Sequence, residues 1–383
     1  MWSIVPVIST NKTPALLLML FALTACFPTS PLPPETEGPS TMEQPTATLA
    51  PQSTVVPTDV ATAEAALLIG TYWYPWFGPG RRHWEEGYLG EPTLGEYDSA
   101  DPAVIRQQVA WATDHGIDLF VASWWGQGSK EDTVLSTSFP EVIEGSDFRF
   151  AILYETPGLL GMDGGHIRLN DARTQQQVVD DVTYLAKTAL SHPNYLRIEG
   201  RPVLFLYLTR TFVGDIQGTM DAVREVVRAE TGEPAFIIGD EVYWQSPSSV
   251  RIHPYDGVTA YNMHTSVPGI ADGFAGKVAR QYAIWARKTS ADGVAFIPDI
   301  LPGFDDTGVR PEAERPVIPR DPESFATQLR DAIALAHGPV RMVMITSWNE
   351  WHEFTSIEPG ESFGLTYLEI VKEAVATEKK ARR

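Results

Sequence analysis

Eight short apolar runs follow one another along residues 67–383, and amphipathic stretches separate them. Each run is a nearly continuous block of apolar residues, which is typical of parallel strands buried on both faces. The first amphipathic stretch begins with Asp101 and Pro102, a typical helix cap and first-turn proline. We expect strands at 68–74, 118–124, 149–154, 202–206, 235–240, 257–261, 294–299 and 342–347, and helices at 102–115, 174–191, 219–230, 270–290, 321–337 and 363–379.

This alternation predicts an α/β fold. Eight strands that alternate with helices over roughly 300 residues favour a single (β/α)8 barrel, the TIM-barrel architecture. The alternative is a doubly wound open sheet. It is disfavoured because the first strand ends in the aromatic segment 72–78, and no glycine-rich turn of the dinucleotide-binding type follows it.

The N-terminal segment has the pattern of an export signal. An apolar run of 11 residues, 15–25, lies between Lys12 and Cys26. It is too short to span a bilayer, which takes about 20 residues, but it fits the apolar region of a secretory signal. Leu23-Thr24-Ala25-Cys26 resembles the bacterial lipobox, which implies that Cys26 is lipidated and becomes the mature N-terminus. An ordinary signal peptide and an apolar N-terminal helix are the alternatives.

Residues 27–66 have a different composition, with 8 Pro, 8 Thr and neither Lys nor Arg among 40 residues. Such a segment cannot bury enough apolar surface to fold, so we expect a disordered, semi-extended tether. A glycosylated stalk is the alternative. The predicted organisation is a lipoprotein signal peptide at 1–25, the lipidated cysteine and linker at 26–66, and the barrel at 67–383. It predicts a membrane-anchored lipoprotein outside the cytoplasm, at the cell surface or facing the periplasm.

The net charge of the chain limits the classes of molecule that it can bind. The chain has 29 Lys and Arg against 49 Asp and Glu, a formal net charge of −20. This disfavours nucleic acid and anionic lipid headgroups, which bind clusters of basic side chains. We expect a monomer that meets the membrane only through its lipid anchor and acts on a neutral or cationic partner. Cys26 is the only cysteine, which excludes an internal disulfide and a cysteine-cluster zinc site.

The predicted strand ends are rich in aromatic residues, carboxylates and histidines. In a (β/α)8 barrel these ends form the active-site face. Aromatic faces pack against the C–H surface of sugar rings, while carboxylates and amides bond the hydroxyls. We therefore expect a cleft that binds an oligosaccharide or polysaccharide, although aromatic packing of the barrel mouth would leave the same pattern. The candidate substrate-binding residues are Tyr74, Trp76, His83, Trp84, Trp124, Trp125, Glu155, Tyr207, Tyr261, His264, Asn349 and Trp351.

Glu350 and Glu353 follow the last predicted strand and are the candidate catalytic pair. Glycosidic cleavage generally uses two carboxyls, one as acid and one as base or nucleophile. On a continuing strand their spacing would point them to opposite faces, whereas on a turn it brings them to the same side. The chain must therefore turn at Trp351 and His352. The alternative is a pair of surface glutamates or helix caps.

A metal centre built from His83, His264 and His352 is disfavoured, because the sequence has no H-E-x-x-H or similarly close ligand spacing. We expect no metal and no other cofactor.

The segment Trp348-Asn349-Glu350-Trp351-His352-Glu353, with Glu358-Pro359 downstream, resembles the signature of glycoside hydrolase family 99. This family contains endo-α-mannosidases and endo-α-mannanases. The segments 74–78, 83–84, 94–102 and 123–126 also resemble the family, in the same order. A related group of polysaccharide-locus proteins shares the W-N-E-W…E-P element.

The resemblance implies a retaining endo-α-mannosidase in which the substrate's own 2-hydroxyl is the nucleophile and a 1,2-anhydro sugar forms. By motif position, Glu350 would deprotonate that hydroxyl. Glu353 would protonate the leaving oxygen and then activate water. Where the family usually has Gly after the second glutamate, this chain has Phe354. The competing hypotheses are a non-catalytic carbohydrate-binding lipoprotein, a related hydrolase of another polysaccharide, and a metal-dependent deacetylase or hydrolase.

Overall fold

The computed structural model describes residues 65–264, 269–312, 315–338 and 340–382. The predicted signal peptide, Cys26 and nearly all of the predicted linker lie outside these residues. Within the described ranges, no helix combines the length and the apolar character needed to cross a bilayer.

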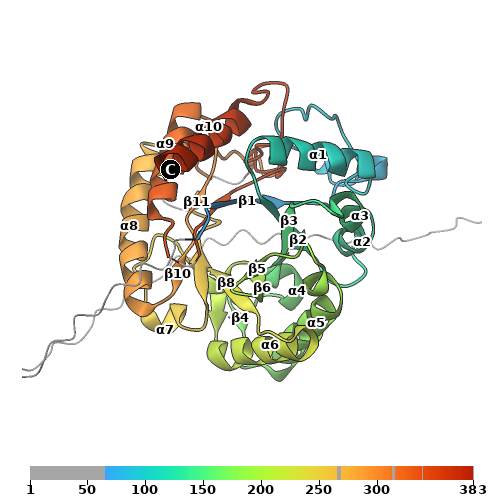
Figure 1. The fold of residues 1–383 in the computed structure, drawn as a ribbon, viewed down its shortest axis with the longest axis vertical. Helices are drawn as coiled ribbons and strands as arrows, with labels where there is room; N and C mark the ends of the chain where they lie inside the picture. The colour runs from blue at the N-terminus through green and yellow to red at the C-terminus, as the bar shows by residue number, and fades with distance from the viewer. Residues whose placement is uncertain (1–64, 265–268, 313–314, 339, 383) are drawn as a thin grey trace, which may run out of the picture. The chain divides into compact units, whose positions relative to one another are not determined.

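A curled sheet of parallel strands forms the centre of the fold (Figure 1). The strand order is β10-β9-β8-β6-β3-β2-β1-β12-β11. β10 pairs with β9 and β11 pairs with β12, yet only Ile297 and Pro298 separate β10 from β11. The two ends of the sheet are therefore consecutive pieces of one chain segment, as in a (β/α)8 barrel. The strands are β1 (Leu68–Trp73), β2 (Leu119–Trp124), β3 (Arg149–Tyr154), β6 (Arg201–Leu206), β8 (Phe236–Asp240), β9 (Gly257–Thr259), β10 (Ala295–Phe296), β11 (Asp299–Ile300) and β12 (Met342–Ile345).

Helices surround the sheet, and each of the six predicted helices is present with shifted ends. α1 begins where the sequence predicts, because the Asp101 carboxylate accepts the N–H of Ala103 at 2.8 Å. α6 ends at Gly232, whose φ of 84° lies in the left-handed region that favours glycine. The long helices are α1 (Pro102–Asp114), α5 (Ala172–Lys187), α6 (Ile216–Thr231), α8 (Phe274–Asp292), α9 (Pro322–Leu335) and α10 (Thr366–Ala381).

Shorter elements lie in the connections and were not predicted. Four short helices follow β2, β3 and β8, and three two-residue strands lie between β3 and α6. They are α2 (Lys130–Ser136), α3 (Ser138–Ile143), α4 (Thr156–Leu160), α7 (Ser249–Ile252), β4 (Ile167–Arg168), β5 (Arg197–Ile198) and β7 (Phe212–Val213).

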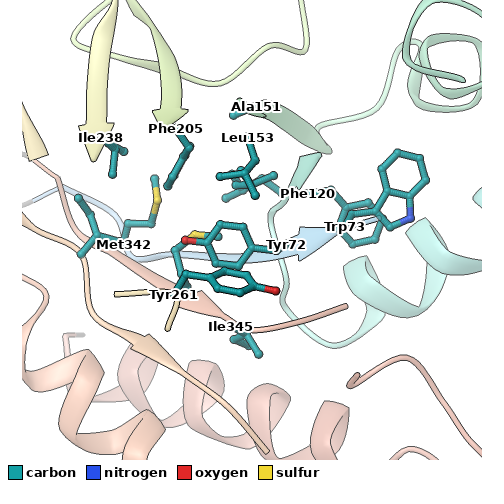
Figure 2. Packing of buried hydrophobic residues seen from close by; sticks show 14 of the residues in the cluster. Tyr72, Trp73, Phe120, Ala151, Leu153, Phe205, Ile238, Tyr261, Met342 and Ile345 are labelled. Atoms are coloured by element: carbon teal, nitrogen blue, oxygen red, sulfur yellow. The ribbon is translucent and has the colours of Figure 1, made fainter. Parts of the chain in front are cut away.

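Side chains of successive strand residues alternate between the inside of the barrel and the helix layer. Inside, the ring of Tyr72 packs edge-on against Tyr261 with ring centroids 4.9 Å apart (Figure 2). The next residue, Trp73, points the other way, and its ring lies 4.9 Å from that of Phe139 in α3. Both faces of β1 are therefore buried, which explains the continuous apolar run in the sequence.

Candidate functional site

The chain turns directly after β12, as the glutamate pair requires. The N–H of Glu350 donates to Oγ of Ser347 at 2.8 Å, and the N–H of Thr355 returns to the carbonyl of Glu350 at 3.2 Å. Residues 351–354 form the turn. The spacing of three therefore places both carboxyls in one buried region: Glu350 is 4% exposed, and the Glu353 side chain is 15% exposed.

Glu350 is held by the histidine two residues further along the chain, His352. Its Oε1 accepts the backbone N–H of His352 at 3.0 Å and lies 3.2 Å from Nδ1 of the same residue. The other ring nitrogen of His352, Nε2, lies 2.8 Å from the carbonyl oxygen of His83. Among the described residues, Oε2 of Glu350 has no hydrogen-bond donor. This oxygen is therefore the one left for a ligand.

Glu353 lies between an arginine and a histidine. Its Oε1 is 3.3 Å from Nη1 of Arg310, and its Oε2 is 3.8 Å from Nε2 of His264. Arg310 also pairs with Asp306 at 3.0 Å. Burial and the negative charge of Glu350 raise the pKa of Glu353 to about 7, although Arg310 opposes them. Near neutral pH this carboxyl can therefore hold a proton, as a general acid must.

Glu155, at the end of β3, is a third buried carboxyl at this mouth. Oγ of Ser123 donates to it at 2.6 Å, and the indole N–H of Trp125 donates to the same hydroxyl at 2.8 Å. Burial is the main cause that raises the pKa of Glu155 to about 8, and the charge of Glu350 adds to it. The ring of Trp125 lies against Gly158, where an added Cβ would come within 2.3 Å of it.

Two tyrosines link opposite sides of the barrel mouth. The hydroxyl of Tyr74 donates to that of Tyr261 at 2.5 Å, and the ring of Tyr207 lies 5.3 Å from that of Tyr261. Asn349 fixes Tyr74 through two bonds to its backbone, at 2.7 and 3.0 Å. Burial, followed by the charges of Glu155 and Glu350, raises the pKa of Tyr74. The predicted residues at the ends of β1, β3 and β12 therefore meet in one place.

Trp76 and His264 are buried at the same mouth with polar atoms unused. The indole N–H of Trp76 and both ring nitrogens of His264 have no hydrogen-bond partner among the described residues. The ring of Trp76 packs 4.5 Å from Tyr74 and 5.1 Å from His83. Burial lowers the pKa of His264 to about 3, so its ring is neutral. Unpartnered polar atoms in such a position favour a site that binds a polar ligand.

Trp124 lies away from the mouth, so the prediction that it contacts the substrate is wrong. Ser123 points to Glu155, so the alternation along β2 turns Trp124 toward the helix layer. Its indole N–H donates to Asp132 of α2 at 2.9 Å, and its ring lines a cavity of about 270 Å³ beside α2 and α5. Trp124 therefore packs the outer side of the sheet.

Trp84 and Trp351 are also packing residues, fully buried behind the mouth. The carboxylate of Glu358 accepts bonds from Trp351 at 2.9 Å and from Tyr97 and Gln108 at 2.7 Å. Trp84 donates to the carbonyl of Tyr97 at 2.9 Å. These bonds hold the turn that carries the glutamate pair, so both tryptophans act on the site only indirectly.

Phe354 occupies the position where the resembled family has glycine. Its φ of 51° lies in the left-handed region, which explains why glycine suits the position and why Phe is strained there. The Phe354 ring packs 4.6 Å from the guanidinium of Arg320, which also lies 4.0 Å from Phe363. Arg320 donates to the carbonyl oxygens of Phe354 and Ser356, both at 2.8 Å. The contacts of Phe354 therefore bind the turn to the loop before α9.

Sequence reasoning missed the loop between β11 and α9. Its backbone N–H at Asp305 donates to the carbonyl of Glu353 at 2.9 Å, and Arg310 reaches the Glu353 side chain. Asp306, which pairs with Arg310, also pairs with Arg315 at 2.9 Å. The only sequence signal was the acidic and basic pair at positions 306 and 310, which is common on surfaces.

Three side chains near Glu350 have the composition of a metal site. His83, Glu86 and His352 offer ligand atoms that lie within 4.8 Å of one another. However, Nε2 of His352 faces a carbonyl oxygen, and Nδ1 of His83 lies 3.0 Å from Glu86. A metal ligand needs an unprotonated nitrogen, and Nε2 of His352 donates a proton instead. Of the two ring nitrogens of His352, only Nδ1 would therefore be left for a metal ion, and this atom lies 3.2 Å from Oε1 of Glu350.

Known proteins resemble this chain over most of its length. A family model described as Glycosyltransferase WbsX matches residues 91–371. The "Glycoprotein endo-alpha-1,2-mannosidase-like protein" of Mus musculus is 23% identical over 370 residues, covering 81% of this chain and 74% of the relative. Its Homo sapiens counterpart is 25% identical over 304 residues, covering 73% of this chain and 60% of the relative. This chain therefore spans only part of its curated relatives.

Solved structures share the fold. A "Glycoside hydrolase-like protein" superimposes with a TM-score of 0.70 at 20% identity, covering 81% of this chain and 94% of the other. The GH99 endo-alpha-mannosidase from Bacteroides thetaiotaomicron gives a TM-score of 0.63 at 22% identity, covering 82% and 98%. These likenesses confirm the (β/α)8 fold, and the curated relatives agree with the motif resemblance. The chain belongs to the family described as Glycosyltransferase WbsX and has the fold of the family 99 endo-α-mannosidases.

Proposed function

We propose that this protein is a retaining, endo-acting glycoside hydrolase that cleaves α-mannosidic linkages in a glycan or mannan. The observation that carries the proposal is the shared position of Glu350 and Glu353. They share one turn at the barrel mouth, where Glu350 is buried and the Glu353 side chain is 15% exposed. Burial and the charge of Glu350 together raise the pKa of Glu353. One ionised and one protonated carboxyl side by side is the pattern that acid–base glycosidases use.

In the proposed first step, Oε2 of Glu350 takes the proton from the 2-hydroxyl of the mannose. The freed oxygen attacks the anomeric carbon, the glycosidic bond breaks, and Glu353 gives its proton to the departing oxygen. In the second step Glu353, now a carboxylate, takes a proton from water. The water oxygen attacks the anomeric carbon, the 1,2-anhydro ring opens, and Glu350 returns its proton to the 2-oxygen. The net reaction is hydrolysis with retention.

The aromatic mouth supplies the sugar-binding surface in this proposal. Trp76 and Trp125 have ring centroids 6.4 Å apart, and Trp76 keeps an unused indole N–H among the described residues. Such rings pack on the C–H face of a sugar, while the N–H is available to a hydroxyl. Tyr74, Tyr261 and Glu155 offer further bonds to hydroxyls beside the glutamate pair.

The family description favours a second candidate, a glycosyltransferase. A transferase would pass the same glycosyl group to a sugar hydroxyl in place of water. We favour hydrolysis of a glycan because the raised pKa of Glu353 suits protonation of a sugar alkoxide, a poor leaving group. A nucleoside diphosphate leaves without that proton.

The product profile of the protein on a panel of α-linked mannans and glucosylated mannosides tests the proposal. We expect oligosaccharide products whose α-anomer appears first in the NMR spectrum, and rates that EDTA leaves unchanged. Loss of activity with EDTA would favour the metal-dependent hydrolase. Turnover only with nucleotide-sugar donors would favour the transferase, and binding without turnover would favour a carbohydrate-binding lipoprotein.

We also propose that the barrel is tethered to a membrane through a lipid on Cys26. The support is the order of apolar run, small residues and single cysteine in the sequence. Cys26→Ser should release the protein from the membrane fraction of a bacterial host and abolish its labelling with radioactive palmitate. Unchanged membrane association of Cys26→Ser would contradict the tether.

A further inference from the structure

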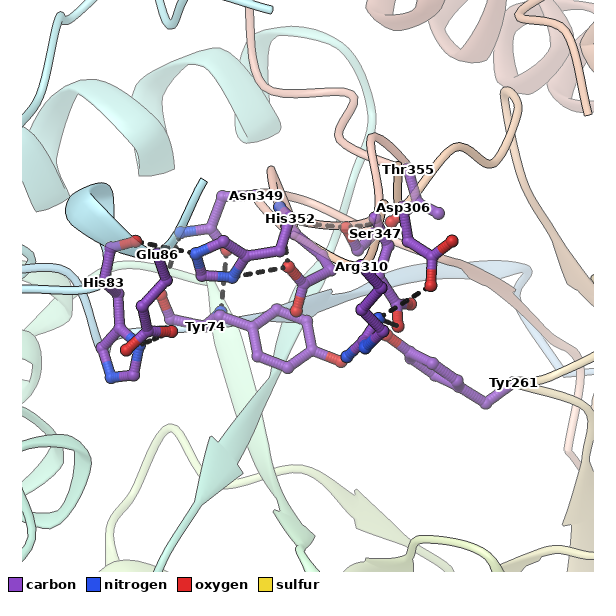
Figure 3. A network of polar contacts seen from close by, with 12 residues as sticks. Tyr74, His83, Glu86, Tyr261, Asp306, Arg310, Ser347, Asn349, His352 and Thr355 are labelled. Atoms are coloured by element: carbon purple, nitrogen blue, oxygen red, sulfur yellow. Dashed lines mark hydrogen bonds and ion pairs between the residues drawn. The ribbon is translucent and has the colours of Figure 1, made fainter. Parts of the chain in front are cut away.

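Both ring nitrogens of His352 face oxygen atoms (Figure 3). Nε2 lies 2.8 Å from the carbonyl oxygen of His83, which can only accept, so this nitrogen carries a proton. Nδ1 lies 3.2 Å from Oε1 of Glu350. If Nδ1 had no proton, its lone pair would face the carboxylate. The pair of His352 and Glu350 is therefore stable only when it holds a proton between these two atoms.

The surroundings favour the charged form of the histidine. Burial by itself lowers the pKa of His352, but the bond and charge of Glu350, the carbonyl of His83 and the charge of Glu86 together raise it. Glu86 is itself 3.0 Å from Nδ1 of His83. Three rings pack on His352. The His83 ring lies 6.0 Å away between centroids, and the rings of Trp76 and Phe77 carry no charge.

We propose that His352 is a positioning residue for the base: as an imidazolium it fixes Oε1 of Glu350 and leaves Oε2 to face the substrate. The inference rests on the function proposed above. It adds the reason why, of two neighbouring carboxyls, Glu350 is the base. Arg310 faces the other carboxyl, Glu353, but shares its charge with Asp306.

His352→Phe tests this role, because it keeps an aromatic ring and removes both donors. Without the imidazolium 3.2 Å from Oε1 of Glu350, the acidic limb of the kcat/KM profile should move to higher pH. We expect kcat to fall by roughly 10- to 100-fold, the range for losing a bond to a charged group, while KM changes little. His352→Gln retains a neutral donor and should give a smaller shift of the same limb.

The matched control is His115→Phe. His115 is also buried, with Nδ1 2.7 Å from the carbonyl of Trp111 and Nε2 3.3 Å from Glu369, but it lies between α1 and α10. It should lower thermal stability and leave both limbs of the pH profile in place. If His352→Phe lost activity while both limbs of its kcat/KM pH profile stayed in place, His352 would have only a structural role and the proposal would be overturned.

Nitrogen-15 NMR of histidine-labelled wild-type protein tests the charge without any substrate. The His352 signals, identified by their loss in His352→Gln, should show both nitrogens protonated at pH 6.5. Glu350→Gln should return the ring to a neutral form at that pH. A neutral His352 ring in the wild type at pH 6.5 would overturn the proposal. This result is independent of whether the protein cleaves mannosides, so failure of the proposed function would be seen separately.

Discussion

Replacing Glu155 with glutamine should stabilise the protein, and increasingly so as the pH rises. The carboxyl is 4% exposed and accepts a hydrogen bond from Ser123 at 2.6 Å. Burial raises its pKa from the ordinary 4.5 to about 8. The pKa is higher in the folded protein than in the unfolded chain, so the protonated carboxyl contributes its full stabilisation below pH 4.5. This stabilisation is lost as the pH rises toward 8.

The size of the effect follows from these two pKa values. At about 1.36 kcal/mol per pH unit, the wild type should lose about 2.5 kcal/mol of unfolding free energy through Glu155 between pH 5 and pH 7. Glutamine has no such dependence. The advantage in Tm of Glu155→Gln over the wild type should therefore grow by about 4 °C between these pH values, for a domain of roughly 300 residues.

Differential scanning fluorimetry at pH 5, 6 and 7 measures this difference. The control is Glu233→Gln, the same chemical change at an exposed position, and its Tm difference should stay constant across the series. An equally constant difference for Glu155→Gln would refute the raised pKa. If the proposed function holds, cleavage of α-mannosides by the variant should fall at the same time, since destabilising groups at active sites are typically retained for function.

Three further substitutions test other contacts of the site. Arg310→Gln removes the cation that lowers the pKa of Glu353, so the alkaline limb of the kcat profile should move to higher pH. Gly158→Ala places a methyl group 2.3 Å from the ring of Trp125. KM for oligosaccharides should then rise more than kcat falls in steady-state kinetics. Arg320→Met removes two bonds to carbonyl oxygens of the glutamate turn, and urea unfolding should show a loss of about 2–4 kcal/mol.

The regular part of the fold could be predicted from the sequence. Buried parallel strands require continuous apolar runs, and all eight predicted runs contain a strand. The seventh run is divided in the structure, because Pro298 cannot donate a backbone hydrogen bond to a neighbouring strand. The helices α2 and α3 have 7 and 6 residues, too few to show helical periodicity.

The site could be predicted where it depends on local sequence and not where it depends on distant segments. The turn at Trp351 brings Glu350 and Glu353 together within four residues of chain. Trp124 was placed at the mouth because it ends a strand, but which face a strand residue takes depends on the register of the whole strand. Arg310 reaches the site from a loop some 40 residues away, and only the closed sheet determines that contact.

The central claim is that Glu353 supplies the proton and Glu350 removes one. It is tested most directly by the two glutamine variants on a natural oligosaccharide and on the glycosyl fluoride of the same glycan, whose leaving group needs no proton. Glu353→Gln should lose ~10²–10⁴-fold on the oligosaccharide and still release fluoride, while Glu350→Gln should lose both reactions. If Glu353→Gln lost both reactions equally, or if either variant cleaved the oligosaccharide at the wild-type rate, the assignment would be contradicted.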